Sequence, residues 1–158
     1  MHTFELHRGT QPLLVSLPHN GSEIPGDILA LLKPFARSAP DTDWSVDRLY
    51  GFAEDLGASI LKPRYSRYVI DLNRPPDDVS LYPGQNSTGL CPLTAFTGEP
   101  IYQDGKQPDQ NAIVHRRAQY WQPYHSALHA ELLRLKQQHG RVLLWEGHSI
   151  QPELPFLF

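Results

Sequence analysis

The sequence predicts an α/β fold with a mixed sheet, and three observations support this prediction. Apolar runs of strand length lie at residues 12–17, 58–62, 67–72 and 141–146. Segments with helical periodicity lie between several of them, and the longest covers residues 109–138. Several runs close on polar residues beside a glycine or proline, which is typical of the strand ends where α/β proteins build their sites. The order strand-helix-helix-strand-strand-loop-helix-strand therefore predicts an α/β/α sandwich.

Two helices are expected in the first half of the chain. Residues 27–36 form the shorter one. The other follows Pro40, where residues 41–43 are of the types that cap helix N-termini. An apolar stripe then continues to about Leu56, and Gly57 fits the position just past a helix end.

The second half of the chain combines a long irregular segment with a long helix. Residues 73–108 hold several prolines and glycines and little periodicity. A loop of this length is usually functional or disordered, and its aromatic residues, including Tyr82, argue against disorder. We therefore expect an ordered lid or wall over the site. In the helix at 109–138, Pro123 is expected to cause a kink or break.

Composition limits the class of protein. The 158 residues are enough for a single domain spanning 1–158. A net charge of −3 argues against phosphate-driven nucleic-acid binding, and no apolar run is long enough to span a membrane. The single cysteine, Cys91, excludes an internal disulfide and fits a reducing compartment. Without an apolar signal core near the start, a cytoplasmic location is expected; the oligomeric state stays open.

Two histidines at predicted strand ends are candidate metal ligands. His19 follows the first strand and His148 the last, each beside a glycine or one residue from it. Imidazole at such a position is a common zinc ligand, although a histidine that only caps a turn would look the same. Glu23 lies four residues after His19, one residue too far for the familiar His-x-x-Glu pair. Glu146 is expected to orient His148 or act as a base.

Other candidates have stronger structural alternatives. Asp43 and Asp47 share one helix face, from which a carboxylate could complete a metal site, yet acidic residues at helix starts are common. His125 and His129 have the i, i+4 spacing of metal ligands but lack the glutamate of the metalloprotease motif. The remaining candidates are two arginines.

Arg67 and Arg74 flank the run that ends in Asp71-Leu72-Asn73. Two guanidiniums at one strand end could clamp a substrate carboxylate bidentately. Alternatively, they form ion pairs with nearby acidic residues such as Asp71.

Several sequence blocks, taken together, resemble the N-formylglutamate amidohydrolases, also called N-formylglutamate deformylases. The more specific blocks are Arg-x-x-x-Asp-Leu-Asn-Arg at 67–74 and Thr-Gly-Leu-Cys-Pro at 88–92. The others are Pro-His-Asn-Gly at 18–21, the Asp-Trp block at 43–50 and Trp-Glu-Gly-His-Ser-Ile at 145–150. The resemblance spans nearly the whole chain in the right order.

This resemblance implies a mixed-sheet α/β zinc hydrolase similar in architecture to the zinc carboxypeptidases. It implies hydrolysis of N-formyl-L-glutamate, a small-molecule substrate, to L-glutamate and formate, the last step of a histidine degradation route. It makes His19, His148 and Asp43 the metal ligands, with zinc or another divalent ion as cofactor. Arg67 and Arg74 would bind the substrate carboxylates, supported by Asn73, and Asp43 or Glu146 would move the proton.

The chain also departs from the family pattern. The family's last block usually reads Trp-Asp-Ala-His-Ser, where this chain has Glu146 and Gly147. Family members continue well past the position of Phe158, which predicts a C-terminally truncated member with an incomplete sheet and an exposed apolar end at 154–158. Two alternatives to the enzyme therefore stay open: a remnant that binds zinc or a diacid without catalysis, and a module that binds peptides through the 73–108 loop.

Overall fold

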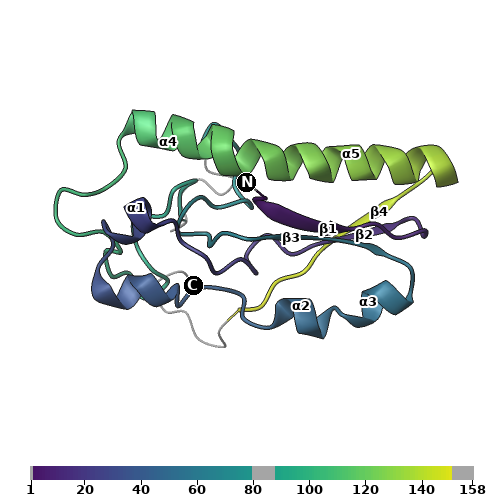
Figure 1. Ribbon diagram of the computed structural model, residues 1–158, viewed down its shortest axis with the longest axis horizontal. Coiled ribbons are helices and arrows are strands. Elements are labelled where there is room, and N and C mark those ends of the chain that lie inside the picture. Colours follow the sequence, from purple (N-terminus) through teal and green to yellow (C-terminus); the bar gives the residue numbers. More distant parts are fainter. Residues whose placement is uncertain (1, 80–87, 151–158) are drawn as a thin grey trace.

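A computed structural model, which describes residues 2–79 and 88–150, has a four-stranded mixed sheet with the strand order β1-β3-β2-β4 (Figure 1). β2 pairs in parallel with both β3 and β4, whereas β1 pairs antiparallel with β3. The α/β class and the mixed sheet are as predicted. The strands are β1 (Phe4–His7), β2 (Leu13–Ser16), β3 (Ser59–Pro63) and β4 (Leu143–Glu146).

Helices lie on both faces of the sheet, which gives the predicted sandwich (Figure 1). One face carries a continuous helical rod in which a π-helical turn joins two α-helices. The opposite face carries two single-turn helices, and two more short helical segments lie at one end of the sheet (Figure 1). The rod is α4 (Gln110–Arg116), η2 (Arg117–Trp121) and α5 (Gln122–His139); the others are α1 (Gly26–Leu29), η1 (Pro34–Ser38), α2 (Val46–Leu49) and α3 (Phe52–Asp55).

The rod begins and ends as its sequence dictates. The Asp109 side chain caps the start by accepting a hydrogen bond from the Ala112 N–H at 2.8 Å. Gly140 ends it with a φ of 73°, in the left-handed region that glycine adopts without steric cost. The helix does not break at Pro123, which lies in the first turn of α5. The irregularity is instead the π-helical turn that ends at Trp121, two residues earlier, consistent with a proline that cannot donate the regular backbone hydrogen bond.

Strand alternation places a separate apolar core on each face of the sheet. Leu14 and Leu61 pack with Tyr124 and Leu135 of α5 in the larger cluster. The smaller cluster lies toward α2 and α3 and consists of Val15, Leu17, Val46, Ala53, Ala58 and Ile60. Because successive strand residues face opposite sides, both faces of the central strands are apolar.

The strand expected at residues 67–72 is not present. This segment forms a buried series of turns, in which the Val69 N–H donates to the Ser66 carbonyl and the Asp71 N–H donates to the Leu90 carbonyl. Val69 and Ile70 are almost fully buried. Their apolar character reflects burial beneath the helical rod rather than membership of a ladder.

The helix expected from residue 41 to 56 is also wrong in its length and its cap. Ser45 has a φ of 62°, which no continuous α-helix allows, so only α2 and α3 form. Much of the predicted stripe is exposed, as at Leu49 (65%) and Phe52 (58%). The helix end at Gly57 is confirmed, with a φ of 76°. The helix expected at 27–36 is likewise divided, into α1 and η1.

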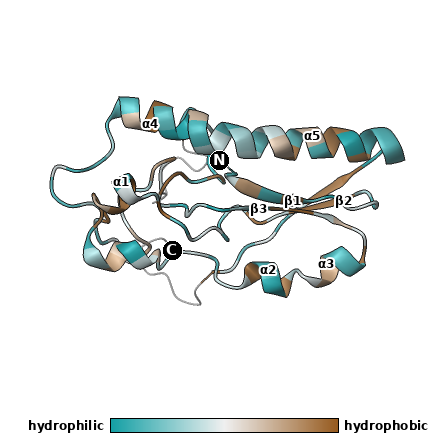
Figure 2. Ribbon diagram, viewed as in Figure 1, coloured by the Kyte–Doolittle hydropathy of each residue, from teal (hydrophilic) through white to brown (hydrophobic). Residues whose placement is uncertain are grey.

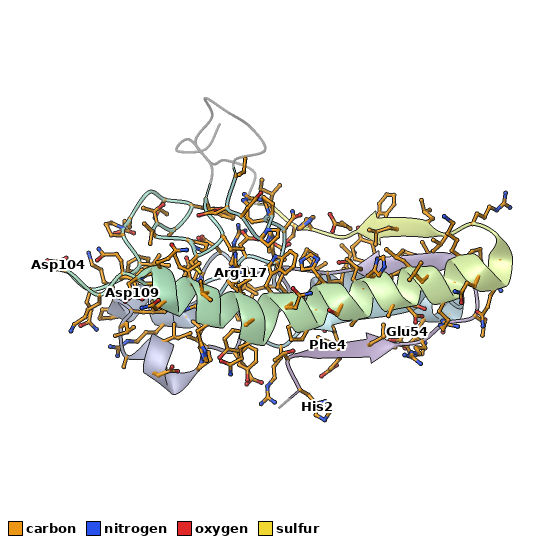
Figure 3. All side chains as sticks on the ribbon, turned by 90° about the horizontal axis from the view of Figure 1, so that it is seen from above. His2, Phe4, Glu54, Asp104, Asp109 and Arg117 are labelled. Atoms are coloured by element: carbon orange, nitrogen blue, oxygen red, sulfur yellow. The ribbon has the colours of Figure 1, made fainter. Side chains whose placement is uncertain are left out.

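The last strand differs from the prediction in its burial. β4 was expected to be buried, but it is an edge strand whose Leu143 and Trp145 are 59% and 51% exposed. Figure 2 shows its apolar colouring at this side of the sheet, and Figure 3 shows it on the side opposite β1, where Phe4 is labelled. Within residues 2–79 and 88–150, β2 is its only strand neighbour.

The irregular segment is ordered in the part that the structure describes. Residues 73–79 and 88–108 contain no helix, and their pairings are isolated bridges such as Thr94 with Pro100. Ile101 and Tyr102 are nevertheless fully buried. Tyr82 and the apolar residues 154–158 lie outside the described residues. None of the helices within residues 2–79 and 88–150 is long and apolar enough to cross a bilayer.

Candidate metal centre

His19 lies in a tight turn directly after β2. The strand pairing continues as the Leu17 N–H donates to the Leu61 carbonyl, and the Asn20 N–H then turns back to the Leu17 carbonyl. Gly21 closes the turn against the next segment, where a Cβ would lie 2.3 Å from the Tyr65 carbonyl oxygen. The sequence therefore fixes His19 in a buried position, with only 5% of its surface exposed.

Three predicted ligands converge at this end of the sheet. His19, Asp43 and His148 each offer one ligand atom, and these atoms all lie within 4.8 Å of one another. Asp43 Oδ2 is 3.2 Å from His148 Nδ1 and 3.9 Å from His19 Nδ1. A backbone hydrogen bond from the Asp43 N–H to the His19 carbonyl, at 3.0 Å, links the two loops that supply them.

The other nitrogen of His19 is held by a buried carboxylate. His19 Nε2 lies 2.7 Å from Asp71 Oδ1, and Asp71 is fully buried. On its other side, His19 Nδ1 lies 3.4 Å from an Nη1 donor of Arg67. Since arginine only donates, this arrangement favours the tautomer with the proton on Nε2 and a lone pair on Nδ1. Burial lowers the pKa of His19, against the opposing effect of Asp71, so the neutral form is favoured.

Asp71 keeps its negative charge despite its burial. Burial by itself would raise its pKa, but the Arg67 guanidinium and the hydrogen bond to His19 hold the pKa well below its usual range. Arg67 Nη2 donates to Asp71 Oδ2 at 2.6 Å. The other carboxylate oxygen also accepts the Asn73 N–H at 2.9 Å, which shapes the turn that carries Asn73 and Arg74.

The two arginines both have partners inside the protein. Besides Asp71, the Arg67 guanidinium lies 4.6 Å from the Phe96 ring centroid and contacts Thr88 Oγ1. Arg74 donates to the carbonyls of Thr88 and Asn73, each at 2.8 Å. The ion-pair alternative is thus observed for Arg67 with Asp71. The guanidiniums meet at Thr88, so their positive charges lie close together beside the cluster.

His148 extends from the end of β4. Gly147 continues the strand pairing through its N–H to the Ser16 carbonyl, and a Cβ there would lie 2.6 Å from Tyr50 and 2.7 Å from Leu17. His148 Nε2 lies 3.4 Å from the side-chain amide of Asn73. Its Nδ1 consequently faces Asp43, and its side chain remains 33% exposed.

Several candidates lie apart from the cluster among the described residues. Glu23 forms an exposed ion pair with Arg64 instead. Asp47 accepts a hydrogen bond from Asn20. His129 is exposed on α5. His125 donates toward a backbone carbonyl. Glu146 has no hydrogen bond or ion pair to His148 in the described part of the chain. It pairs with Ser16 of β2, whose side chain makes a hydrogen bond to Tyr124 on α5. Side chains of paired residues lie on the same face of a sheet, so Glu146 lies on the α5 face.

Some site residues escaped the sequence analysis. Thr88 bridges Arg67 and Arg74, and its only signal was its place in the Thr-Gly-Leu-Cys-Pro block. Phe96 covers the Arg67 guanidinium, and its backbone N–H reaches Asp41. An open pocket of about 220 Å³ lies beside the cluster and includes Asp43, Phe96 and Ser149 in its lining.

The chemistry of this donor set fits a divalent metal ion. Two imidazoles and a carboxylate are standard zinc ligands, and ligand atoms 2.0–2.2 Å from a tetrahedral ion are about 3.3–3.6 Å apart. The two separations from Asp43, 3.2 and 3.9 Å, lie close to this range, whereas the three ligand atoms together span up to 4.8 Å. The Asp71 carboxylate behind His19 is the outer partner that metal-bound imidazoles commonly have.

Comparison with known proteins places this chain in a family. Residues 11–158 match the model of the family described as N-formylglutamate amidohydrolase. The chain belongs to the N-formylglutamate amidohydrolase family. It is 49% identical over 152 residues to an N-formylglutamate deformylase of Pseudomonas putida, covering 96% of this chain and 57% of that protein. A Pseudomonas aeruginosa N-formylglutamate deformylase is 48% identical over 151 residues, with coverage of 96% and 56%.

The fold of this chain is also shared with solved structures. An N-formylglutamate amidohydrolase of Ralstonia eutropha JMP134 superposes with a TM-score of 0.80 at 24% identity, over 95% of this chain and 59% of that one. A gene product of Agrobacterium tumefaciens gives 0.70 at 23% identity, over 99% and 60%. The chain thus spans a little more than half the length of these relatives.

Proposed function

We propose that this chain carries the metal-binding part of an enzyme that hydrolyses N-formyl-L-glutamate to L-glutamate and formate. The observation that carries the proposal is the convergence of His19, Asp43 and His148, backed by Asp71, in a member of this family. Zinc is the ion we expect, and the reaction would close a histidine degradation route in the cytoplasm.

The proposed roles follow from the positions of the side chains. A bound divalent ion would lower the pKa of a water molecule to about 7 and polarise the formyl oxygen. His19 offers Nδ1, because Asp71 occupies its Nε2. His148 offers Nδ1 on the same side, where Asp43 Oδ2 faces it. The buried position of His19 and Asp43 excludes bulk water from this side of the site.

Positive charge beside the cluster supports a substrate with carboxylates. Arg67 and Arg74 share Thr88 as a partner, and each guanidinium has more N–H groups than its partners among residues 2–79 and 88–150 use. Asn73 adds an amide donor next to His148. We propose that these three residues bind the glutamate carboxylates, and each charge-assisted hydrogen bond would contribute roughly 1.5–3 kcal/mol.

A carboxylate must move the proton from the water to the leaving amine. We propose Glu146 and Asp43 as the candidates. Asp43 faces both histidines, whereas Glu146 lacks a contact with His148 among the described residues. This last observation favours a second candidate function, in which the chain binds the metal and the diacid without hydrolysis.

The deciding experiment measures metal content and formate release together. Purified protein and a His19→Ala, His148→Ala double variant would be compared by elemental analysis and by a formate assay with N-formyl-L-glutamate. His129→Ala, an exposed histidine outside the cluster, is the matched control. One zinc per chain, lost only in the double variant, with formate released, supports the enzyme.

The other outcomes separate the alternatives. Stoichiometric zinc without formate release supports binding without hydrolysis. Folded protein without any metal contradicts the ligand assignment. If the protein is active, Glu146→Gln and Asp43→Asn then show which carboxylate moves the proton, because only the variant at that position loses turnover while it still binds both zinc and substrate.

A further inference from the structure

The helical rod contacts the site segment through side chains that donate to backbone carbonyls. Four residues of α4, η2 and α5 reach the segment 69–76, which carries Asp71, Asn73 and Arg74. The contacts are Arg116 Nη1 to Val69 O (3.2 Å), His125 Nε2 to Leu72 O (2.9 Å), Trp121 Nε1 to Arg74 O (3.0 Å) and Arg117 Nη1 to Pro76 O (2.9 Å).

These contacts replace a strand ladder. Segment 69–76 forms turns rather than the predicted strand, so its carbonyls need partners other than neighbouring strands. Two of its side chains point toward the metal cluster, where Asp71 meets His19 and Asn73 meets His148. The segment is thus held by hydrogen bonds from the rod on one side, and on the other side it supplies residues to the site.

Trp121 and His125 form the central pair of this arrangement. Their rings stack with centroids 3.7 Å apart and planes inclined by 23°. Each uses its single ring N–H on the carbonyl of a residue next to Asn73: Trp121 on Arg74 and His125 on Leu72. Burial lowers the pKa of His125, so a neutral ring with its proton on Nε2 makes this contact. Fixing the carbonyls of Leu72 and Arg74 fixes the peptide planes 72–73 and 74–75, which lie on either side of the Asn73–Arg74 pair.

The π-helical turn explains how one rod face supplies these donors. In a regular α-helix, at about 100° per residue, Arg117 and His125 would point about 80° apart. The turn at Arg117–Trp121 has more residues per turn and brings their directions together. Such turns occur frequently at functional sites. Arg117, labelled in Figure 3, marks the start of this turn.

We propose that Trp121 and His125 are positioning residues that set the orientation of Asn73 and Arg74 for binding the substrate carboxylates. This inference rests on the proposed function of the site as one that binds a glutamate diacid. Neither residue touches the metal cluster among the described residues, so they act only through the backbone of the site segment.

The test uses variants that remove a donor and keep the packing. Trp121→Phe removes the indole N–H and retains a ring to stack on His125. His125→Leu removes the imidazole donor, whereas His125→Gln places an amide N–H near the position of Nε2. His129→Leu, on the exposed part of the same helix, is the matched control.

Two measurements on the full chain separate positioning from folding. Hydrogen exchange of the backbone amides in 70–76, which are those of residues 70–74 because Pro75 and Pro76 have none, is expected to rise in Trp121→Phe and His125→Leu. The KM for N-formyl-L-glutamate, or the Kd if the chain does not turn over, is expected to rise about fivefold per lost hydrogen bond. kcat and zinc content are expected to stay near wild type, and His125→Gln is expected to restore both measurements.

The possible failures are distinguishable. Unchanged exchange in 70–76 and unchanged KM or Kd in both donor-deleted variants overturn the inference, and so does a loss equal to that in His129→Leu. If wild type binds no diacid at all, the proposed function fails. Faster exchange confined to 70–76 in that case would still establish the positioning contact, and unchanged exchange would overturn it.

Discussion

Asp71 Oδ1 lies 2.7 Å from His19 Nε2 and so determines which nitrogen of His19 faces the cluster. Both side chains are buried, and the second oxygen of Asp71 is neutralised by Arg67. An unpaired carboxylate at this depth would be costly. The carboxylate therefore links the orientation of a candidate metal ligand to the arginine of the proposed substrate site.

Replacing Asp71 tests this link. In Asp71→Asn the amide keeps the size of the side chain, but its NH2 group meets donors from Arg67 or His19. We expect metal affinity to fall about 10- to 100-fold, as for other outer partners of metal-bound histidine. Competition with a zinc-binding dye measures this affinity. Asp55→Asn, an exposed carboxylate on α3, is the control, and equal affinities in the two variants would contradict the role of Asp71.

Arg67→Lys is expected to destabilise the fold. A lysine has no planar fork and cannot keep the contacts with Asp71, Thr88 and the Phe96 ring together. We expect the free energy of unfolding to fall by about 1.5–3 kcal/mol, the range for a hydrogen bond to a charged group. Urea titration measures it. Arg64→Lys, an arginine in an exposed ion pair, should change stability little.

How far the site followed from the sequence depended on the residue. His19 and His148 were placed correctly because an apolar run that stops at histidine and glycine marks a strand end, and the strands do end there. Asp43 reached the cluster for a different reason from the expected one. Its loop is held by a backbone hydrogen bond from the Asp43 N–H to the His19 carbonyl, and Asp43 does not lie at a helix start.

The misplaced elements have a common physical cause. The apolar residues at 67–72 indicate burial, which a buried turn and a buried strand share. Here the backbone carbonyls of the turn accept hydrogen bonds from Arg116 and His125 instead of from a neighbouring strand. The stripe at 41–56 fitted a helix, but the left-handed Ser45 breaks it. Such long-range partners and single backbone angles leave no periodic signal in the sequence.

Cys91 is expected to resist thiol reagents in the folded protein. Burial raises the pKa of its thiol to about 11, and its surface is only 6% exposed. The thiolate is the reactive form, so reaction with a disulfide reagent at pH 8 should be slow and should become rapid in urea. Fast, complete modification of folded protein would show that the segment around Cys91 opens readily.

A buried ion pair away from the site should also contribute to stability. Glu131 on α5 is 1% exposed and accepts hydrogen bonds from Arg134 and Ser59. Arg134 also donates a hydrogen bond to the Gly9 carbonyl. Arg134→Met leaves Glu131 buried with fewer partners, which we expect to cost about 1.5–3 kcal/mol. Lys136→Met, exposed on the same helix, is the control. Equal urea midpoints for both variants would contradict this role.

The same pair predicts an acid dependence of stability with a defined sign. The hydrogen bond from Arg134 holds the pKa of Glu131 below its ordinary value of 4.5, against the effect of burial. The unfolded chain therefore binds this proton at a higher pH than the folded one, so the stabilising contribution is complete above about pH 4.5 and is lost as the pH falls toward the folded pKa.

Urea midpoints at pH 7 and below pH 4.5 measure the loss. Asp71 also makes stability depend on acid, because its pKa in the folded protein lies well below its usual range, so the comparison that matters is with Glu131→Gln. That variant should be less stable at pH 7 and should lose less stability on acidification; an identical loss in both proteins would show that Glu131 does not couple its proton to folding.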